Sequence, residues 1–137
     1  MADVYQRFPA LRQLTEGAFS LLLGLTVDSA VEGKVKVRMP FHPRLLNYGP
    51  PDVPVHGGAI GSLADFAACA AVWTLPGTQR SATISLTVNY SAPAVQSELL
   101  ATATVRRGGK RVASIAVEIR DRHETLIADA LVTYKVA

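Results

Sequence analysis

Cysteine is almost absent from this chain of 137 residues, and so are long hydrophobic runs and a marked excess of either charge. The single cysteine, Cys69, excludes an internal disulfide and a cysteine-based metal cluster. We expect a cytoplasmic protein, because one lone thiol is compatible with a reducing cytosol, although a secreted protein without disulfides would look the same. The net charge of +3 is weak support for nucleic-acid binding, and we expect none.

The longest apolar stretch, residues 59–75, is shorter than the roughly 20 residues that span a membrane, and it contains Asp65. We therefore expect it to be a core helix and expect no membrane contact. The opening run MADVYQRFPALRQL alternates polar and apolar side chains and lacks the hydrophobic centre of a signal peptide. With 49% apolar residues, no repeat and no low-complexity tract, the chain suits one globular domain over residues 1–137.

Helical spacing and alternation predict the order of the elements. Apolar side chains recur at steps of three and four through residues 3–22, which predicts an amphipathic helix bent near Pro9. Residues 25–39 alternate and predict a hairpin that turns near Glu32-Gly33. Gly108-Gly109 predicts a two-residue hairpin turn, and four further strands are expected within residues 83–90, 99–106, 111–120 and 125–136.

This order predicts an α+β fold. An antiparallel sheet of five to six strands has one face to cover, and residues 59–75 are the only segment apolar enough to cover it. We expect a sheet wrapped around this one long central helix, with an N-terminal helix in addition. Residues 40–55 carry five prolines in sixteen positions, which excludes a helix or a central strand there. Long ordered loops of this kind are often functional.

The most informative run joins that loop to the apolar helix. His56-Gly57-Gly58 opens the helix, and Asp65 follows Gly58 by seven positions with almost no charge nearby in sequence. Free N–H groups at a helix start can stabilise a carbonyl oxygen that becomes negative, and glycines let a ligand approach them. A buried carboxylate is costly unless it is paired, so a functional site is the leading interpretation. About 10 Å of helix separates the two features, which requires a substrate that bridges them or a second subunit.

Other interpretations of these residues stay open. A Gly-Gly pair before a helix is often a plain turn, and His56 can be a structural residue. Ser62 lacks the second glycine of a nucleophile elbow, and a triad of Ser62, His56 and Asp65 would place its groups on different helix faces. No histidine has metal-ligand spacing, so we expect neither a metal nor a redox cofactor.

Together with Asn47 and the run TISLTVNYSAPA from Thr83 to Ala94, the His56-Gly57-Gly58 and Asp65 pattern resembles the hotdog-fold acyl-CoA thioesterases. The resemblance covers nearly the whole chain and is greatest to the phenylacetate-degradation branch of the 4-hydroxybenzoyl-CoA thioesterase superfamily. It implies the hotdog fold, hydrolysis of an acyl-CoA thioester, and a homodimer or a tetramer built from two dimers. It leaves open whether the acyl group is aromatic, medium-chain or long-chain. The alternatives are a hotdog enoyl-thioester hydratase or dehydratase and a non-catalytic acyl-CoA-binding protein.

The resemblance also implies roles for the residues that match it. Asp65 takes the place of the carboxylate that activates water or acts as nucleophile. Gly58 takes the place of the residue whose N–H polarises the thioester carbonyl, while His56 and Gly57 shape the turn.

Two further roles follow from the same resemblance. Thr83 matches a position that meets the carboxylate of the other subunit. Asn47 matches a loop residue that orients water or substrate, although its linker to the helix is longer than usual. Tyr48 or Asp52 are therefore alternatives for that place.

The only cluster of charge lies in the hairpin at Gly108-Gly109. A solvated turn that protects a sheet edge is the plain interpretation. The functional interpretation is that the hairpin binds the phosphates of coenzyme A through Arg106, Arg107, Lys110 and Arg111. For the acyl group, the candidate pocket residues are Phe66, Trp73 and Leu75.

Overall fold

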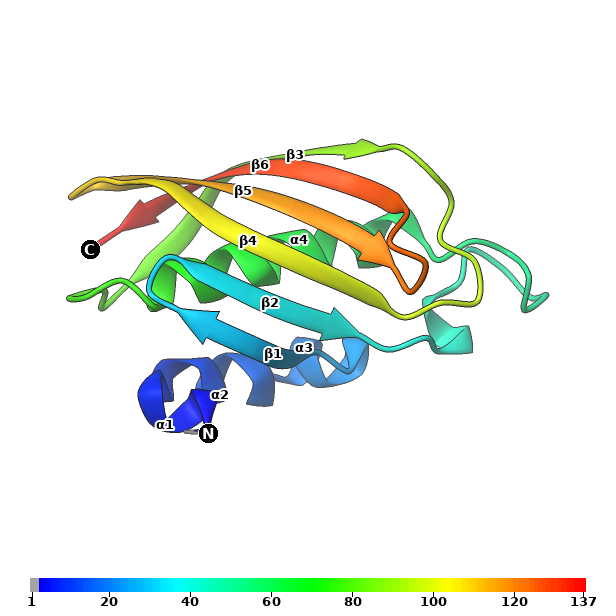
Figure 1. Ribbon diagram of the computed structural model, residues 1–137, viewed down its shortest axis with the longest axis horizontal. Helices are drawn as coiled ribbons and strands as arrows, with labels where there is room; N and C mark the ends of the chain where they lie inside the picture. The colour runs from blue at the N-terminus through cyan, green and yellow to red at the C-terminus, as the bar shows by residue number, and fades with distance from the viewer. Residues whose placement is uncertain (1–2) are drawn as a thin grey trace.

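The computed structural model describes residues 3–137, which form a six-stranded antiparallel sheet curved around one long helix (Figure 1). The strands lie in the order β1-β2-β4-β5-β6-β3, so β1 and β3 are the two edges. The expected α+β arrangement is confirmed. The strand bounds are β1 (Thr26–Val31), β2 (Lys34–Met39), β3 (Ser81–Tyr90), β4 (Leu99–Gly108), β5 (Val112–Asp121) and β6 (Leu126–Val136).

The N-terminal segment forms three short helices instead of one bent helix, namely α1 (Val4–Arg7), α2 (Pro9–Glu16) and α3 (Ala18–Leu23). The expected break near Pro9 is present, because this proline starts α2. A second break was not expected and falls at Gly17, whose extended backbone separates α2 from α3. The chain then turns through Gly24, which has a φ of 73° and ends α3 just before β1.

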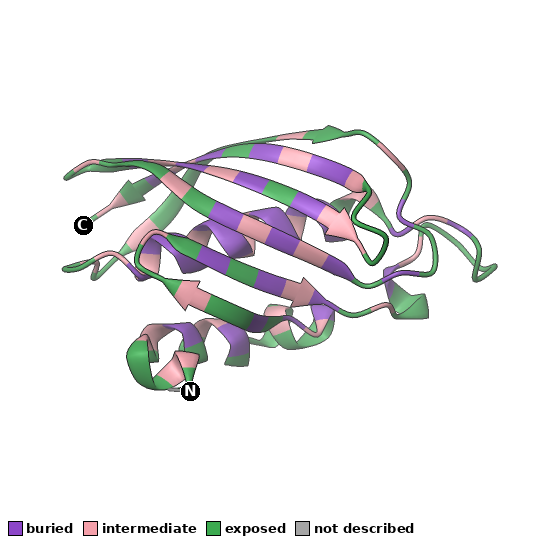
Figure 2. Ribbon diagram, in the orientation of Figure 1, coloured by how far each residue is buried: buried purple, intermediate pink, exposed green. Residues whose placement is uncertain are grey.

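The central helix α4 (Gly57–Trp73) covers the concave face of the sheet. Ten of its residues are buried, and six of these are alanine or glycine outside the first turn, so the helix lies close to the strands. Figure 2 shows buried and exposed residues alternating along the strands that face it, as a sheet with one covered face requires. The strand residues that bury their side chains against α4 include Val35, Val37, Ala101, Ala103, Ile115, Val117, Ala130 and Val132.

The two predicted hairpin turns have different outcomes. The β1–β2 turn lies where expected, with Gly33 at a φ of 79°. The prediction of a two-residue turn at Gly108-Gly109 is wrong, because β4 ends at Gly108 and β5 begins only at Val112. Neither glycine has the positive φ that such a turn requires. Gly109 is needed for space instead, since a Cβ there would lie 2.6 Å from the carbonyl oxygen of Val112.

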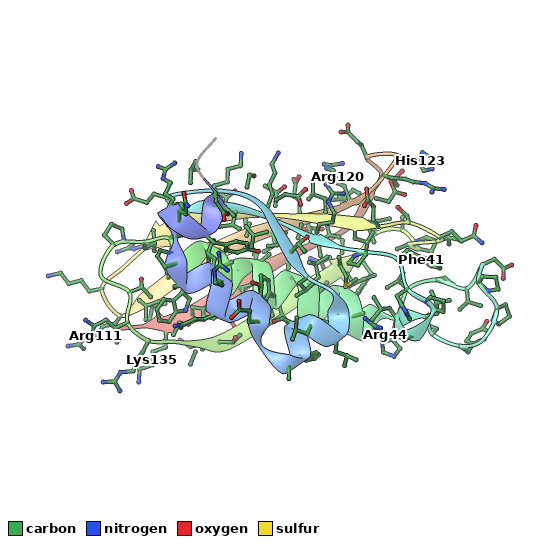
Figure 3. The ribbon with its side chains drawn as sticks, turned by 90° about the horizontal axis from the view of Figure 1, so that it is seen from below. Phe41, Arg44, Arg111, Arg120, His123 and Lys135 are labelled. Atoms are coloured by element: carbon green, nitrogen blue, oxygen red, sulfur yellow. The ribbon has the colours of Figure 1, made fainter. Side chains whose placement is uncertain are left out.

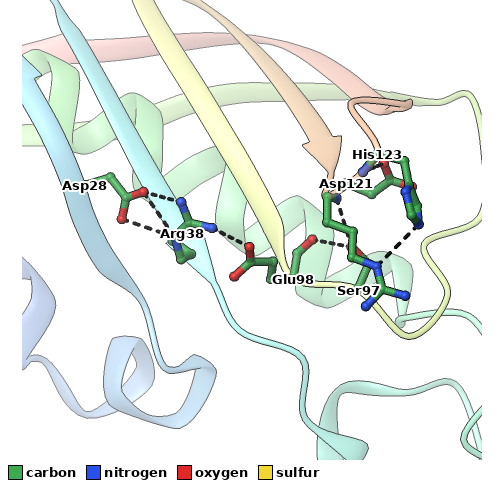
Figure 4. A network of polar contacts seen from close by, with 7 residues as sticks. Asp28, Arg38, Ser97, Glu98, Asp121 and His123 are labelled. Atoms are coloured by element: carbon green, nitrogen blue, oxygen red, sulfur yellow. Dashed lines mark hydrogen bonds and ion pairs between the residues drawn. The ribbon is translucent and has the colours of Figure 1, made fainter.

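Charged pairs lie on the outer face of the sheet near β1 and β2. Arg38 on β2 bridges two carboxylates, with its Nη2 2.5 Å from Asp28 and its Nη1 2.7 Å from Glu98 (Figure 4). These hydrogen bonds raise the pKa of Arg38 above its ordinary value. In the turn after β5, Asp121 accepts the backbone N–H of His123 at 2.9 Å. The pairs are solvent-exposed, so they contribute little to stability and mainly keep this face hydrated.

The proline-rich loop between β2 and α4 has little regular structure, as expected. It holds one turn of 3-10 helix, Pro43–Leu45, and a single bridge between Leu46 and Val55. The bridge closes the loop on itself just before the first turn of α4. Across residues 3–137, we find no helix that combines the length and the apolar character needed to cross a membrane.

Candidate active site

The first turn of α4 is capped by the side chain of His56. Its Nδ1 accepts a hydrogen bond from the N–H of Gly58 at 2.8 Å. A Cβ on Gly58 would lie 2.9 Å from that nitrogen, so only glycine leaves room for this cap. The N–H of Gly58 is therefore engaged in the free protein, whereas that of Gly57 meets no acceptor among residues 3–137. The sequence predicts a donor at this turn and does not reveal that the histidine competes for it.

Tyr90 fixes the same turn from the edge of the sheet. Its hydroxyl donates to the carbonyl oxygen of Gly57 at 2.6 Å, and its ring lies 3.5 Å from the place of a Cβ on Gly57. The ring therefore packs on the first turn of the helix, at a distance where a Cβ on residue 57 would make an ordinary contact. Tyr90 belongs to the quoted strand motif, but the sequence alone does not indicate which group it contacts.

Asp65 lies at the middle of α4 and is half-buried. Its Oδ1 accepts two hydrogen bonds, from the Thr83 hydroxyl at 2.8 Å and from the Tyr134 hydroxyl at 2.7 Å. The resemblance places Thr83 against the carboxylate of another subunit, whereas in this structure it contacts Asp65 of its own chain. The reason is topological, since β3 pairs with β6 and α4 packs beneath both strands.

The carboxylate of Asp65 stands in the wall of a pocket between α3, α4 and β3, with a volume of about 340 Å³. Polar groups set among apolar side chains in a hollow are typical of small-molecule sites. The apolar lining consists of Phe19, Leu23, Leu25, Phe66 and Ala82, and the polar groups besides Asp65 are those of Ser20, Ser62, Cys69, Ser81, Thr83 and Tyr134.

A second hollow, of about 270 Å³, adjoins the first and reaches the start of α4. His56 and Gly58 line it, and it shares Phe19, Leu23 and Ser62 with the pocket of Asp65. Positions 58, 62 and 65 follow one another by four and three residues, so they lie on one helix face. The helix start and the carboxylate therefore border adjoining hollows of the same chain.

Ser62 occupies the helix face between these two features. A triad of Ser62, His56 and Asp65 was expected to place its groups on different helix faces; of the three, Ser62 and Asp65 line the same pocket and His56 does not. The hydroxyl of Ser62 donates to the carbonyl oxygen of Gly58 at 2.8 Å. This bond orients the hydroxyl toward the backbone, and no bond to His56 activates it.

A second polar cluster lies where Cys69 and Ser81 line the pocket. Trp73 donates from Nε1 to the Ser81 hydroxyl at 2.9 Å, and the Cys69 sulfur lies 3.8 Å from the same oxygen. Burial raises the pKa of the Cys69 thiol, which favours the unreactive thiol form. Of the expected acyl-pocket residues, Phe66 lines the pocket and Trp73 reaches it through Ser81, whereas Leu75 lines a different hollow beside the β4–β5 hairpin.

The proline-rich loop brings residues other than Asn47 to the site. The side chain of Asn47 is exposed, its N–H donates to the Pro54 carbonyl, and it lines neither hollow. Tyr48 and Asp52 are exposed as well. The loop residues beside His56 and Gly58 are Arg44, Leu45 and Leu46.

The basic hairpin does not line the pocket of Asp65 within one chain. Figure 3 shows Arg111 at one end of the molecule and Arg44, which borders the start of α4, at the other. Within the described part of the chain, none of the hairpin's Arg106, Arg107, Lys110 and Arg111 forms an ion pair. Its role toward coenzyme A stays a prediction.

Comparisons with known proteins agree with this geometry. A family model described as thioesterase superfamily matches residues 55–128, which include the first turn of α4, Asp65 and most of the sheet. A Halobacterium salinarum protein, itself only provisionally named an esterase, is 36% identical over 110 residues, 78% of this chain and 72% of that protein.

Two solved structures extend the similarity to the whole fold. A conserved protein of Pseudomonas aeruginosa is 30% identical with a TM-score of 0.83, covering 92% of this chain and 98% of that one. The PaaI protein from the phenylacetic acid degradation operon of E. coli is 25% identical with a TM-score of 0.82, covering 98% and 96%. The expected hotdog fold and the expected family resemblance are both confirmed.

Proposed function

The chain belongs to the thioesterase superfamily, and we propose that this thioester hydrolase acts on acyl-coenzyme A, releasing a free acid and coenzyme A. One observation carries the proposal, namely the carboxylate of Asp65 in the wall of a mostly apolar pocket. Its Oδ1 is held by two hydroxyl donors, while its Oδ2 accepts from no residue among 3–137. A carboxylate fixed in this way can take a proton from water or attack an acyl carbon.

The thioester oxygen would bind at the first turn of α4. The family resemblance assigns this task to the N–H of Gly58, which is released when the His56 side chain moves away or rotates. The neighbouring N–H of Gly57 is already free of acceptors among the described residues. Both donors point from a helix N-terminus, whose partial positive charge favours the negative oxygen of the tetrahedral intermediate.

The working unit in this proposal is a dimer that joins two copies along β3. This strand is a sheet edge of ten residues, and most of its side chains are exposed. Ile84 and Tyr90 expose 58% and 54% of their surface, and Leu131 on the neighbouring strand β6 exposes 61%. An exposed apolar edge strand of this length is a template for pairing with another chain.

The phosphates of coenzyme A have a candidate partner in the basic hairpin. Its four cations are exposed, and arginine and lysine bind phosphate oxygens well. Charge reversal at Arg107 should raise KM for an acyl-CoA and leave kcat unchanged. An unchanged KM would indicate that the hairpin is a solvated turn that protects the sheet edge and does not bind coenzyme A.

A panel of acyl-CoA substrates with a thiol-detecting readout tests the proposed activity. The panel contains aromatic, medium-chain and long-chain acyl groups, together with an enoyl-CoA whose hydration is followed separately. Release of coenzyme A from any saturated or aromatic acyl-CoA supports the proposal. Hydration of the enoyl-CoA without thiol release would indicate a hydratase, and tight binding without turnover would indicate a binding protein.

A further inference from the structure

The register of the sheet brings a second side chain to the candidate carboxylate besides the expected threonine. Thr83 on β3 is the direct cross-strand partner of Tyr134 on β6. A bulge follows at once, because Ser85 pairs with Thr133 and leaves Ile84 without a partner. Bulges of this kind re-aim side chains near active sites. Here the two hydroxyls lie side by side and both donate to Oδ1 of Asp65.

We infer that Tyr134 is a positioning residue, which fixes the carboxylate of Asp65 so that Oδ2 is the oxygen that acts on water or on the acyl carbon. This inference rests on the proposed function. The hydroxyl of Tyr134 lies 2.7 Å from Oδ1 of Asp65 and 2.9 Å from the backbone carbonyl oxygen of Asp65. It therefore contacts both the side chain and the backbone of Asp65, and with Thr83 it gives Oδ1 two hydroxyl partners.

Tyr134 is suited to this task by its burial. Only 3% of its surface is exposed, and it packs between the sheet and α4. Burial raises the pKa of the Tyr134 hydroxyl well above its ordinary value. The hydroxyl thus stays protonated, and stays a donor, across the pH range in which hydrolysis can be assayed.

Two groups besides Tyr134 face Asp65, and one of them, Thr83, donates to the same Oδ1. Cys69 lies one helical turn further along α4, and Thr83 and Tyr134 face the carboxylate from the sheet. A donor to a carboxylate favours its charged form, which is the form that acts as base or nucleophile. Loss of the Tyr134 hydroxyl should therefore lower kcat and shift the acidic limb of the pH–rate profile to higher pH.

The experiment compares Tyr134→Phe with Tyr5→Phe, each assayed with the best acyl-CoA substrate from the panel. Tyr5 is a half-buried tyrosine on α1 that lines neither hollow, so its variant makes the same chemical change elsewhere. We expect Tyr134→Phe to lower kcat by about tenfold, the effect of losing one hydrogen bond to a charged group, with KM changed less than twofold. We expect its acidic limb to move upward and the limb of Tyr5→Phe to stay at the wild-type position. Both variants are assayed at a temperature where circular dichroism shows them folded.

Two results would overturn the inference. One is a kcat and an acidic limb for Tyr134→Phe that equal those of Tyr5→Phe. The other is a lower kcat without a shift of the limb, which would indicate a general structural effect. Asp65→Asn separates this inference from the proposed function, because unchanged hydrolysis by Asp65→Asn contradicts the proposed function itself. Loss of hydrolysis in Asp65→Asn beside normal Tyr134→Phe kinetics contradicts only the positioning role.

Discussion

At the scale of single residues, the helix start combines two tasks that compete for one N–H group. His56 caps α4 by accepting from Gly58, and the same N–H is the expected donor to the thioester oxygen. A residue that only capped the helix would be replaceable by another capping side chain. A residue that also shaped the oxyanion site would not.

The substitutions His56→Ala and His56→Asn test the capping task. Loss of the cap in His56→Ala should lower the free energy of unfolding by about 1 kcal/mol, whereas asparagine is itself a favoured cap and should retain most of it. Denaturant unfolding measures both values. Equal stability of His56→Ala and the wild-type protein would contradict the capping role.

The sequence predicts the candidate carboxylate and the helix start more fully than it predicts their surroundings. A lone Asp65 in an apolar segment and two glycines before a helix are local patterns, so they are visible in sequence. The contact between Asp65 and Tyr134 joins residues 69 positions apart in the chain, and no local pattern specifies it. Asn47 was placed by resemblance, and the longer loop leaves it outside both hollows.

At the scale of the elements, the close contact between α4 and the sheet depends on small side chains. Ala101 and Ala103 on β4 are fully buried against the helix, and α4 is itself rich in alanine. This spacing positions Asp65 against Thr83 and Tyr134. Alternation predicts which strand residues face the helix, and it does not predict how near the helix lies.

The substitution Ala103→Leu tests this packing. The added carbons have no space, so the free energy of unfolding should fall by about 1–3 kcal/mol. Thr104→Leu is the matched control, because Thr104 is the next residue along β4 and is exposed on the outer face. Chemical denaturation of both variants gives the comparison. If Ala103→Leu is no less stable than Thr104→Leu, the result contradicts the close packing of α4 on β4.

The elements themselves were largely predictable from the sequence, because period and proline content are local signals. The exceptions have local steric causes. Gly17 adds a break between α2 and α3, and the β4–β5 connection spans residues 109–111 where the sequence predicts a tight two-residue turn. In that connection Gly109 is needed because a side chain would collide with Val112, and not because the backbone adopts a positive φ.

At the scale of the whole molecule, the two edges of the sheet differ. The edge strand β1 has six residues and lies beside the N-terminal helices, whereas β3 has ten and is mostly exposed. The proposed dimer uses only β3.

A charge placed on each edge in turn tests the dimer. Ile84→Lys adds a cation at 58% exposure on β3, and Val31→Lys adds one at 49% exposure on β1. Sedimentation should give twice the chain mass of 14.6 kDa for the wild-type protein and for Val31→Lys, and the chain mass for Ile84→Lys. A dimer that persists in Ile84→Lys but dissociates in Val31→Lys would move the interface to the other edge.

The most direct measurement of the central claim is the kcat/KM of Asp65→Asn for the best acyl-CoA substrate. Asp129→Asn is the matched control, since this carboxylate lies on β6 and lines neither hollow. We expect Asp65→Asn to lose at least about a hundredfold, the usual effect of removing a general base or nucleophile, while its melting temperature stays close to that of the wild type. We expect Asp129→Asn to keep its activity. Hydrolysis by Asp65→Asn at the wild-type rate would contradict the account.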